Sequence, residues 1–313
     1  MTKRAVAFVV LVVAAFAMTE GARRLLLTRD RNTRQPADGG DHERTPQRLI
    51  SRAPSVTETV YALGLGDRLV GATPWCTYPE EAKTIPRTGT LLDPNYEKIV
   101  ALEPDLVLVT TGMTSDREAK KLSELGINTM PLEQRTIDDV LSAITRIGGA
   151  CRVEDRARKL RRRLTDGMNR LRRLTEDRGS PRVLIVVGRE YSQPKVSTVH
   201  VAGNKRNFYH DILRLLNARN AYDGSGAEYP ELGVEGLIKL NPDVIIEVTG
   251  SAVDDGDRLL PHWDHLKRIR AVIDGRVYVF TEAYAGRPGP RFVEAMELFA
   301  AAIYPDLPLE ERP

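Results

Sequence analysis

Two stretches of the sequence resemble each other and decide the fold. The first is Asn95-Tyr-Glu-Lys-Ile-Val-Ala-Leu-Glu-Pro-Asp-Leu-Val-Leu-Val-Thr-Thr-Gly112, and the second is Gly233-Val-Glu-Gly-Leu-Ile-Lys-Leu-Asn-Pro-Asp-Val-Ile-Ile-Glu-Val-Thr-Gly250. They align without gaps at an offset of 235 − 97 = 138 residues. Each copy predicts a short helix, a Pro-Asp break and an apolar strand buried on both faces. A generic helix–turn–strand unit would also give such a match, but one copy before and one after a long helix favours two related α/β lobes.

Strands and helices alternate on either side of both copies. Apolar runs predict strands at residues 48–51, 69–70, 106–109, 127–130, 183–187, 244–246 and 277–280. Helical patterns cover residues 95–102, 115–125, 136–148, 208–216 and 291–303. Another helix is expected to begin near Pro54, with Ser55 as its cap and Glu58 completing a capping box. The alternation predicts an α/β fold with mostly parallel sheet.

Residues 152–178 interrupt this alternation and predict one long helix, because their apolar side chains recur at three- and four-residue spacing. The segment holds 11 basic and 5 acidic residues, a net charge of 11 − 5 = +6. A basic amphipathic helix can bind a membrane surface or nucleic acid. Acidic residues interrupt the positive face here, which favours a solvated face on a helix that packs against two lobes.

The predicted architecture is therefore two Rossmann-like lobes joined by one long rigid α-helix, with a ligand cleft between the lobes. We expect an N-terminal α/β lobe at residues 46–149, a linking helix at 150–179 and a C-terminal α/β lobe at 180–313. A helical connection limits hinge bending, because bending a helix costs backbone hydrogen bonds.

The composition excludes several classes of protein. Apolar residues make up 42% and charged residues 28% of the 313 residues, which excludes a polytopic membrane protein, a collagen-like fibre and a wholly disordered chain. Two cysteines exclude a disulfide-built scaffold and a four-cysteine zinc site. The net charge of +3 is not the uniform basic surface of a nucleic-acid binder.

The amino terminus has the pattern of an export signal. Lys3 and Arg4 precede an uncharged apolar run that ends at Met18, and Ala15-Phe-Ala17 offers small residues for cleavage. Residues 1–18 are therefore expected to be a signal peptide or an N-terminal anchor, and residues 19–45 a flexible spacer. Either alternative places the rest of the chain in the periplasm or another extracytoplasmic compartment.

At this point the sequence resembles a known family, the periplasmic solute-binding proteins with a helical backbone that serve ABC importers of cobalamin, ferric siderophores and haem. The resemblance runs from about Arg48 to Pro305 and is nearest to the cobalamin-binding branch. It is carried by Arg48-Leu-Ile-Ser with Pro54-Ser-Val-Thr-Glu58, Tyr78-Pro-Glu-Glu-Ala82, Glu97-Lys-Ile-Val-Ala-Leu-Glu-Pro-Asp-Leu-Val107, Trp263 with Gly275-Arg-Val-Tyr278, and Arg287-Pro-Gly-Pro-Arg291.

The resemblance implies a role for one glutamate in each repeat. In cobalamin-binding members a surface glutamate on each lobe docks into arginine pockets of the dimeric permease, and the matching positions here are Glu97 and Glu235. A carboxylate in the first turn of a helix is favoured by the helix dipole, so both residues are also consistent with simple stabilisation of their helices.

The resemblance also implies a ligand site built from loops that follow the strand ends. The candidate ligand-binding residues are Trp75, Tyr78, Arg189, Tyr191, Tyr229, Tyr284, Arg287 and Arg291. Aromatic faces suit a flat chelate and arginines suit its anionic groups, but Trp75 also fits a core position and Arg291 a packing role. Leu91, Thr110 and Tyr229 stand where the cobalamin-binding pattern has tryptophans, which weakens the case for a corrin ring.

The expected function is that of an extracytoplasmic binding protein. It captures a metal chelate, either cobalamin or another corrinoid or a ferric siderophore, and delivers it to an ABC permease dimer with its ATPase subunits. No cofactor, resident metal or nucleic-acid partner is expected, and the free protein should be a monomer. The alternatives are a membrane-tethered chelate sensor or scaffold, and a secreted enzyme, for which we find no catalytic motif. A shared metal at His262 and His265 lacks a third ligand nearby. Pairing of Cys76 with Cys151 is open.

Overall fold

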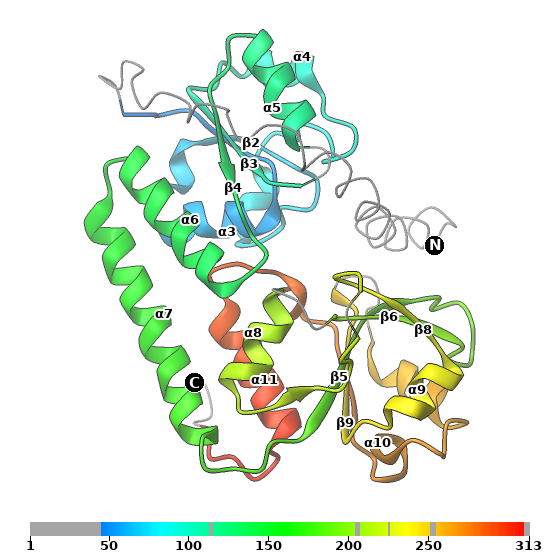
Figure 1. The fold of residues 1–313 in the computed structure, drawn as a ribbon. Coiled ribbons are helices and arrows are strands. Elements are labelled where there is room, and N and C mark those ends of the chain that lie inside the picture. The colour runs from blue at the N-terminus through cyan, green and yellow to red at the C-terminus, as the bar shows by residue number, and fades with distance from the viewer. Residues whose placement is uncertain (1–44, 113–114, 204–206, 225, 251–254, 310–313) are drawn as a thin grey trace, which may run out of the picture. The chain divides into compact units, whose positions relative to one another are not determined.

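The computed structural model describes residues 45–112, 115–203, 207–224, 226–250 and 255–309, so the predicted signal segment and all but the last residue of the predicted spacer lie outside the described residues. The chain divides into two compact units whose boundary lies between Leu164 and Thr165, inside helix α7 (Glu154–Thr175). We call them the N-terminal unit (residues 45–164) and the C-terminal unit (residues 165–309), and we describe each by itself (Figure 1).

The N-terminal unit is built on a parallel sheet with the strand order β2-β1-β3-β4. The strands are β1 (Leu49–Ser51), β2 (Leu69–Ala72), β3 (Leu106–Thr110) and β4 (Thr129–Leu132). The helices are α3 (Pro54–Ala62), α4 (Tyr96–Ala101), α5 (Ser115–Glu124) and α6 (Ile137–Ala150). Side chains of α4 and α5 form one core with those of β1 and β3, whereas α3 and α6 lie on the other side of the sheet (Figure 1).

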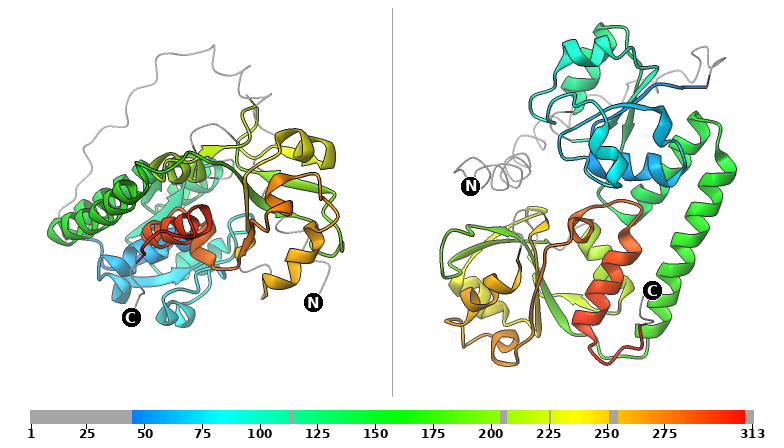
Figure 2. Two further views of the ribbon diagram at one scale, coloured as in Figure 1. Left: turned by 90° about the horizontal axis from the view of Figure 1, so that it is seen from below. Right: turned by 180° about the vertical axis from the view of Figure 1, so that it is seen from behind.

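The C-terminal unit has a larger sheet with the order β10-β9-β5-β6-β8. The strands are β5 (Arg182–Arg189), β6 (Thr198–Val201), β7 (Arg219–Asn220), β8 (Glu231–Gly233), β9 (Val244–Val248) and β10 (Val277–Phe280). The helices are α8 (Phe208–Leu215), α9 (Val234–Leu240), α10 (Arg270–Ile273) and α11 (Phe292–Ile303). Figure 2 shows α9 and α10 on one side of this sheet and α8 and α11 on the other.

Each unit contains four parallel strands in the same order. The order β2-β1-β3-β4 corresponds to β7-β5-β9-β10, and all of these pairs are parallel. Strands β3 and β9 carry the apolar runs of the two repeats. The prediction of a two-lobed α/β fold with parallel sheets is therefore confirmed, and the sequence repeat corresponds to a structural one.

The aspartate of each Pro-Asp pair takes part in the same set of hydrogen bonds, which we call the latch of that unit. Asp105 accepts hydrogen bonds from the backbone N–H groups of Gln47 and Arg48, at 2.7 and 2.8 Å, and Asp243 accepts one from that of Arg182 at 2.8 Å. The two arginines donate in turn to the last carbonyls of the short helices, Arg48 to Leu102 and Arg182 to Leu240, both at 2.7 Å. Each latch ties a short helix to the start of the neighbouring strand.

One detail of the predicted elements was wrong. Helix α3 begins at Pro54 with Ala53 as its N-cap, so Ser55 and Glu58 form no capping box. Proline suits the first helical position because its fixed φ is already helical. The long helix predicted over residues 152–178 is α7, and the helix predicted over residues 136–148 is α6, which ends before Cys151.

Helix α7 packs through glycine contacts in both units. In the N-terminal unit, a Cβ on Gly148 of α6 would lie 2.5 Å from the Ala157 Cβ, so the two helices meet where glycine leaves room. In the C-terminal unit, Gly167 faces Val293 of α11 in the same way. The arginine-rich face is largely solvated, as predicted. Among the described residues, no helix has the length and apolar character needed to cross a membrane.

Candidate functional site

Two exposed aromatic side chains follow strand β2 in the N-terminal unit. Trp75 is 49% and Tyr78 46% exposed, so Trp75 is not a core residue. Arg87 fixes the backbone of their loop, because its guanidinium donates to the carbonyls of Thr73 at 3.0 Å and Cys76 at 3.1 Å. A flat apolar surface on a fixed loop suits a planar ligand. Both residues remain predicted ligand contacts.

Arg189 does not lie on the surface of the C-terminal unit. Its guanidinium is buried at the end of β5, 2.7 Å from the Glu247 carboxylate, and Trp263 donates to the same carboxylate at 2.9 Å. The charge of Arg189 is therefore already satisfied in the core, which is not the ligand-facing position predicted for it. Tyr191 packs its ring against Arg189 at 5.1 Å, and burial raises the pKa of its hydroxyl, which has no hydrogen-bond partner among the described residues.

The other candidates of the C-terminal unit are partly exposed. Arg291 caps α11 and places its guanidinium 4.9 Å from the ring centroid of Tyr284, a cation–π contact. Arg287 follows Tyr284 in the same short segment, and its N–H donates to the Tyr284 carbonyl at 3.3 Å. The structure thus brings these three residues together. Tyr229 lies in a separate loop before β8.

The two docking candidates occupy equivalent positions. Glu97 and Glu235 are exposed, and each lies in the first turn of the short helix of its repeat, α4 or α9. Asn95 caps α4 by accepting a hydrogen bond from the Lys98 N–H at 2.9 Å. Helix α9 has no such side-chain cap. Helix α9 therefore depends more than α4 on the carboxylate in its first turn, which is Glu235.

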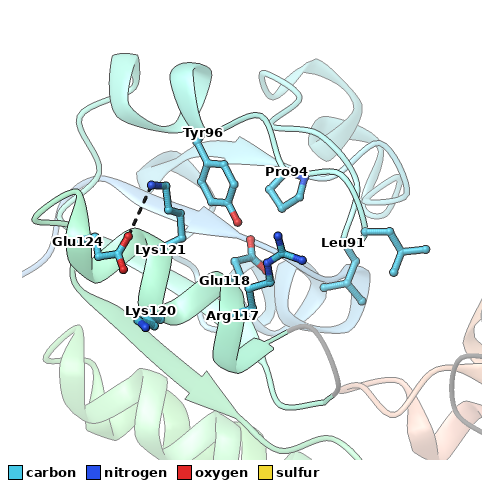
Figure 3. A pocket seen from close by; sticks show the side chains of 9 residues that line it. Leu91, Pro94, Tyr96, Arg117, Glu118, Lys120, Lys121 and Glu124 are labelled. Carbon is cyan, nitrogen blue, oxygen red and sulfur yellow. Dashed lines mark ion pairs between the residues drawn. The ribbon is translucent and has the colours of Figure 1, made fainter. Parts of the chain in front are cut away.

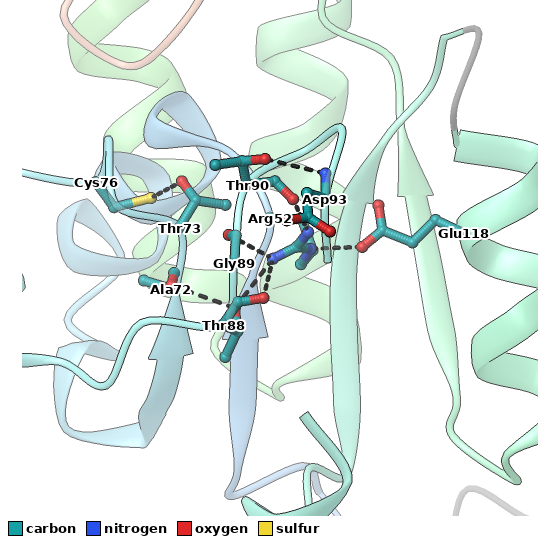
Figure 4. A network of polar contacts seen from close by, with 9 residues as sticks. All are labelled: Arg52, Ala72, Thr73, Cys76, Thr88, Gly89, Thr90, Asp93 and Glu118. Atoms are coloured by element: carbon teal, nitrogen blue, oxygen red, sulfur yellow. Dashed lines mark hydrogen bonds and ion pairs between the residues drawn. The ribbon is translucent and has the colours of Figure 1, made fainter. Parts of the chain in front are cut away.

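A buried arginine that the sequence did not single out organises the N-terminal unit (Figure 4). Arg52 donates to the Glu118 carboxylate at 2.5 Å, to the carbonyl and hydroxyl of Thr88 at 3.0 Å each, and to the carbonyls of Gly89 and Thr90 at 3.2 and 2.6 Å. Burial raises the pKa of Glu118, and the Arg52 guanidinium opposes that shift. An arginine directly after a predicted strand was the only signal of this network in the sequence.

A half-open cavity of about 500 Å³ lies above this network, between the loop that follows Thr90 and helix α5 (Figure 3). It is lined by Leu91, Leu92, Pro94, Tyr96, Arg117, Glu118, Lys120, Lys121 and Glu124. None of the predicted ligand-binding residues lines it. Leu91 was noted in the sequence only because it replaces an expected tryptophan.

Among the described residues, no group of three or more histidine, cysteine, aspartate or glutamate side chains is placed to hold a metal ion. His262 contacts Arg189, with 3.2 Å between Nδ1 and the guanidinium, and partial burial and this cation lower the pKa of His262. Cys76 and Cys151 are both buried free thiols in the structure. The Cys76 sulfur lies 3.1 Å from the Thr73 hydroxyl and points into the unit.

Two α/β units with parallel sheets are the architecture of two-lobed binding proteins, but fold alone does not assign function. Comparison with known proteins identifies the family. The sequence matches the periplasmic binding protein family over residues 49–284. It is 32% identical over 272 residues to an uncharacterized ABC transporter substrate-binding lipoprotein of Bacillus subtilis, covering 84% of this chain and 82% of the relative. It is 27% identical to the vitamin B12-binding protein of Pectobacterium carotovorum, covering 80% of this chain and 86% of that protein.

Solved structures agree with this comparison. A periplasmic heme-binding protein from Pseudomonas aeruginosa superposes with a TM-score of 0.70 at 28% identity, covering 84% of this chain and 94% of the other. The periplasmic vitamin B12-binding protein of Vibrio cholerae gives 0.71 at 23% identity, covering 83% and 97%. The chain belongs to the periplasmic binding protein family. Its named relatives are binding proteins, and membership implies an extracytoplasmic location.

Proposed function

We propose that this protein is the solute-binding protein of an ABC importer, which captures a metal chelate and delivers it to the permease. The observation that carries the proposal is the match over residues 49–284 together with relatives named for vitamin B12 and heme binding. The chain itself would supply no catalysis and no ATP site, so transport energy would come from the ATPase subunits of the importer.

The chelate would be held by aromatic surface and by arginine. Trp75 and Tyr78 offer exposed rings on a loop fixed by Arg87, and such rings bind flat groups at low entropic cost. Arg287 and Arg291 offer guanidinium groups for carboxylate or phosphate groups of the chelate.

Titration of the purified full chain with cobalamin, haem and several ferric siderophores tests this proposal. The chain has two tryptophans, of which Trp75 is exposed and Trp263 is 1% exposed, so a ligand on Trp75 should quench the exposed component of the fluorescence. Saturable one-to-one binding of one chelate is expected. Absence of binding across the whole panel would contradict the chelate assignment.

The Trp75→Ala variant tests the aromatic contact. We expect its affinity for the identified chelate to fall by about 5- to 150-fold, as for a contact residue that contributes about 1–3 kcal/mol. Ile273→Ala is a matched control, because Ile273 is an exposed apolar residue of α10 outside the predicted contacts. Unchanged affinity in the Trp75 variant would place this side chain outside the ligand site.

A further inference from the structure

Helix α7 is a strongly basic element of the structure. It holds nine basic and three acidic residues, a net charge of 9 − 3 = +6. Its buried apolar side chains form a single stripe, made of Ala157, Leu160, Leu164 and Leu171. Most of its cations are exposed instead, namely Arg156, Arg158, Lys159, Arg162, Arg163, Arg172 and Arg173. The helix therefore buries one side and turns a basic side to solvent.

Most of this charge is not neutralised within the protein. Four exposed cations form no side-chain ion pair or hydrogen bond with any residue that the structure describes, namely Lys159, Arg163, Arg172 and Arg173. Arg156 donates to the Gly64 carbonyl at 3.0 Å and Arg161 donates to the Thr145 hydroxyl, and both of these acceptors are neutral. Cations that meet no acid in the folded protein keep their full field for an anionic partner.

The acidic residues of α7 do little to weaken this field. Glu154 and Asp155 lie in the first turn, where the helix dipole favours a carboxylate, and Asp155 is ion-paired with Arg158. Residues 156–175 hold nine basic residues and one acidic residue, Asp166. The acidic interruptions noted in the sequence therefore fall at the two ends of the helix and at one position between them.

The cations without partners are spread along the helix and are not gathered around one point. Lys159, Arg163 and Arg173 lie on the solvent side of α7, which is one continuous helix (Figure 1). The first and last are 173 − 159 = 14 residues apart, about 21 Å at the usual helical rise. None of the large apolar side chains that the structure shows as exposed lies on α7. An extended row of charge without an apolar anchor fits a charged surface better than a compact anion or insertion into a bilayer.

We propose that the basic face of α7, defined by Lys159, Arg163 and Arg173, docks on a lipid bilayer that carries anionic headgroups. Membership of the periplasmic binding protein family implies a location outside the cytoplasm, where a membrane surface is the neighbouring polyanion and nucleic acid is not. Each cation near such a surface raises the affinity about fivefold, which corresponds to about 1 kcal/mol. The basic face shares no residue with the predicted chelate contacts or with the docking glutamates, so the proposal is independent of both.

Co-sedimentation of the purified full chain with lipid vesicles tests the partner. Vesicles of phosphatidylcholine alone are compared with vesicles that also contain phosphatidylglycerol, because any binding through the apolar residues 5–18 would be common to both kinds. At low salt the chain should bind the anionic vesicles at least about tenfold more tightly. Salt at about 1 M should remove this preference, because it shortens the Debye length to about 3 Å. Equal binding to both kinds of vesicle at low salt, or a preference that survives high salt, would overturn the proposal.

A triple variant of the basic face tests the location. Lys159→Gln with Arg163→Gln and Arg173→Gln should weaken binding to anionic vesicles by about tenfold or more, while binding to neutral vesicles stays the same. All three side chains are exposed and form no ion pair within the described residues, so the variant should fold.

The matched control removes the same charge elsewhere, by Lys98→Gln with Lys239→Gln and Lys267→Gln at exposed positions outside α7. Its binding to anionic vesicles should fall much less. An unchanged affinity of the α7 variant, or an equal loss in both variants, would exclude this face as the docking surface. Tighter binding of the wild type to soluble polyglutamate than to anionic vesicles would assign an acidic protein as the partner and overturn the lipid proposal.

Discussion

Arg52 and Arg189 show how a single buried arginine can define one end of a parallel sheet. Arg52 follows β1 and forms an ion pair with the buried Glu118 at 2.5 Å. Arg189 is the last residue of β5 and forms an ion pair with the buried Glu247 at 2.7 Å. Burying a charge is costly unless the partner and the remaining hydrogen bonds are present. Both arginines meet that condition, so their roles are in fixing loops and not in contacting solvent.

Replacing Arg52 by methionine should therefore strongly destabilise the protein. Five hydrogen bonds to Glu118 and to residues 88–90 are lost, and Glu118 is left as an uncompensated buried charge. We expect the free energy of unfolding to fall by about 3–5 kcal/mol in urea titrations. Lys83→Met, which removes an exposed pair with Glu80, should change it by less than about 1 kcal/mol. Similar losses in both variants would contradict this interpretation.

His262 should make stability depend on pH in a predictable direction. Its pKa is lowered in the folded state by burial and by Arg189, so the unfolded chain binds more protons between that lowered pKa and about 6.5. The free energy of unfolding should consequently rise with pH across this window and fall as the pH drops through it.

The measurement is a set of urea titrations between pH 5 and 7.5 on the wild type and His262→Gln. The variant should show a shallower pH dependence. His265→Gln is the control, since His265 is an exposed neighbour on the same segment. A slope that is unchanged by the His262 substitution, or flattened equally by both, would show that His262 is not the titrating group.

At the scale of elements, the repeated latch explains why the same Pro-Asp pair occurs in both copies. Asp105 and Asp243 bind the backbone at the start of β1 and β5, and their own N–H groups donate to the carbonyls of Arg48 and Arg182 at 2.9 Å each. A short helix of six or seven residues is marginal alone. The latch supplies the tertiary anchor that such a helix needs.

Asp105→Ala and Asp243→Ala should each destabilise the protein by about 1–3 kcal/mol, because the first leaves two backbone N–H groups and the second leaves one without a partner. Hydrogen exchange should quicken mainly in β1 and β3 for the first variant and in β5 and β9 for the second. Asp105→Asn retains a side-chain oxygen and should recover most of the loss. Equal effects of alanine and asparagine would argue against the hydrogen-bonded latch.

The sequence predicts the strands that are continuous apolar runs, because such a run is recognisable without knowing which strands pair with it. Val183 to Val187 and Leu106 to Val109 are continuous apolar runs, and both formed central strands, β5 and β3. Strands β6 and β8, Thr-Val-His-Val and Glu-Leu-Gly, are short and partly polar, and antiparallel pairing beside β5 stabilises them. Their local pattern therefore carried no signal.

The candidate site was predictable only in part, for a related reason. Exposed Trp75 followed from its place in a loop after a strand. The burial of Arg189 did not follow from the sequence, because its partner Glu247 lies 58 residues away along the chain. The same holds for Arg52, whose partner Glu118 lies 66 residues away. An acidic residue inside the apolar run of β9 was the one available clue.

At the scale of the whole molecule, Glu97 and Glu235 should set the orientation on a dimeric permease. Charge pairs at the edge of an interface mainly fix register and partner choice. We expect Glu97→Arg with Glu235→Arg to abolish uptake of the chelate while leaving its affinity intact, measured by uptake into cells and by titration. Glu154→Arg with Glu176→Arg, on exposed positions in and beside α7, should leave uptake normal. Normal uptake by the first double variant would exclude docking through these glutamates.

The position of the unit boundary has a consequence for export. All sheet pairs of the N-terminal unit join strands between Leu49 and Leu132, and the described part of the C-terminal unit begins only at Thr165. A chain threaded through a membrane channel amino end first can therefore complete one sheet on the far side while the second half is still in transit. Domains that finish in turn leave fewer unpaired strand edges exposed to aggregation at any moment. For a chain exported amino end first, the order of the two units would therefore also be the order in which their sheets assemble.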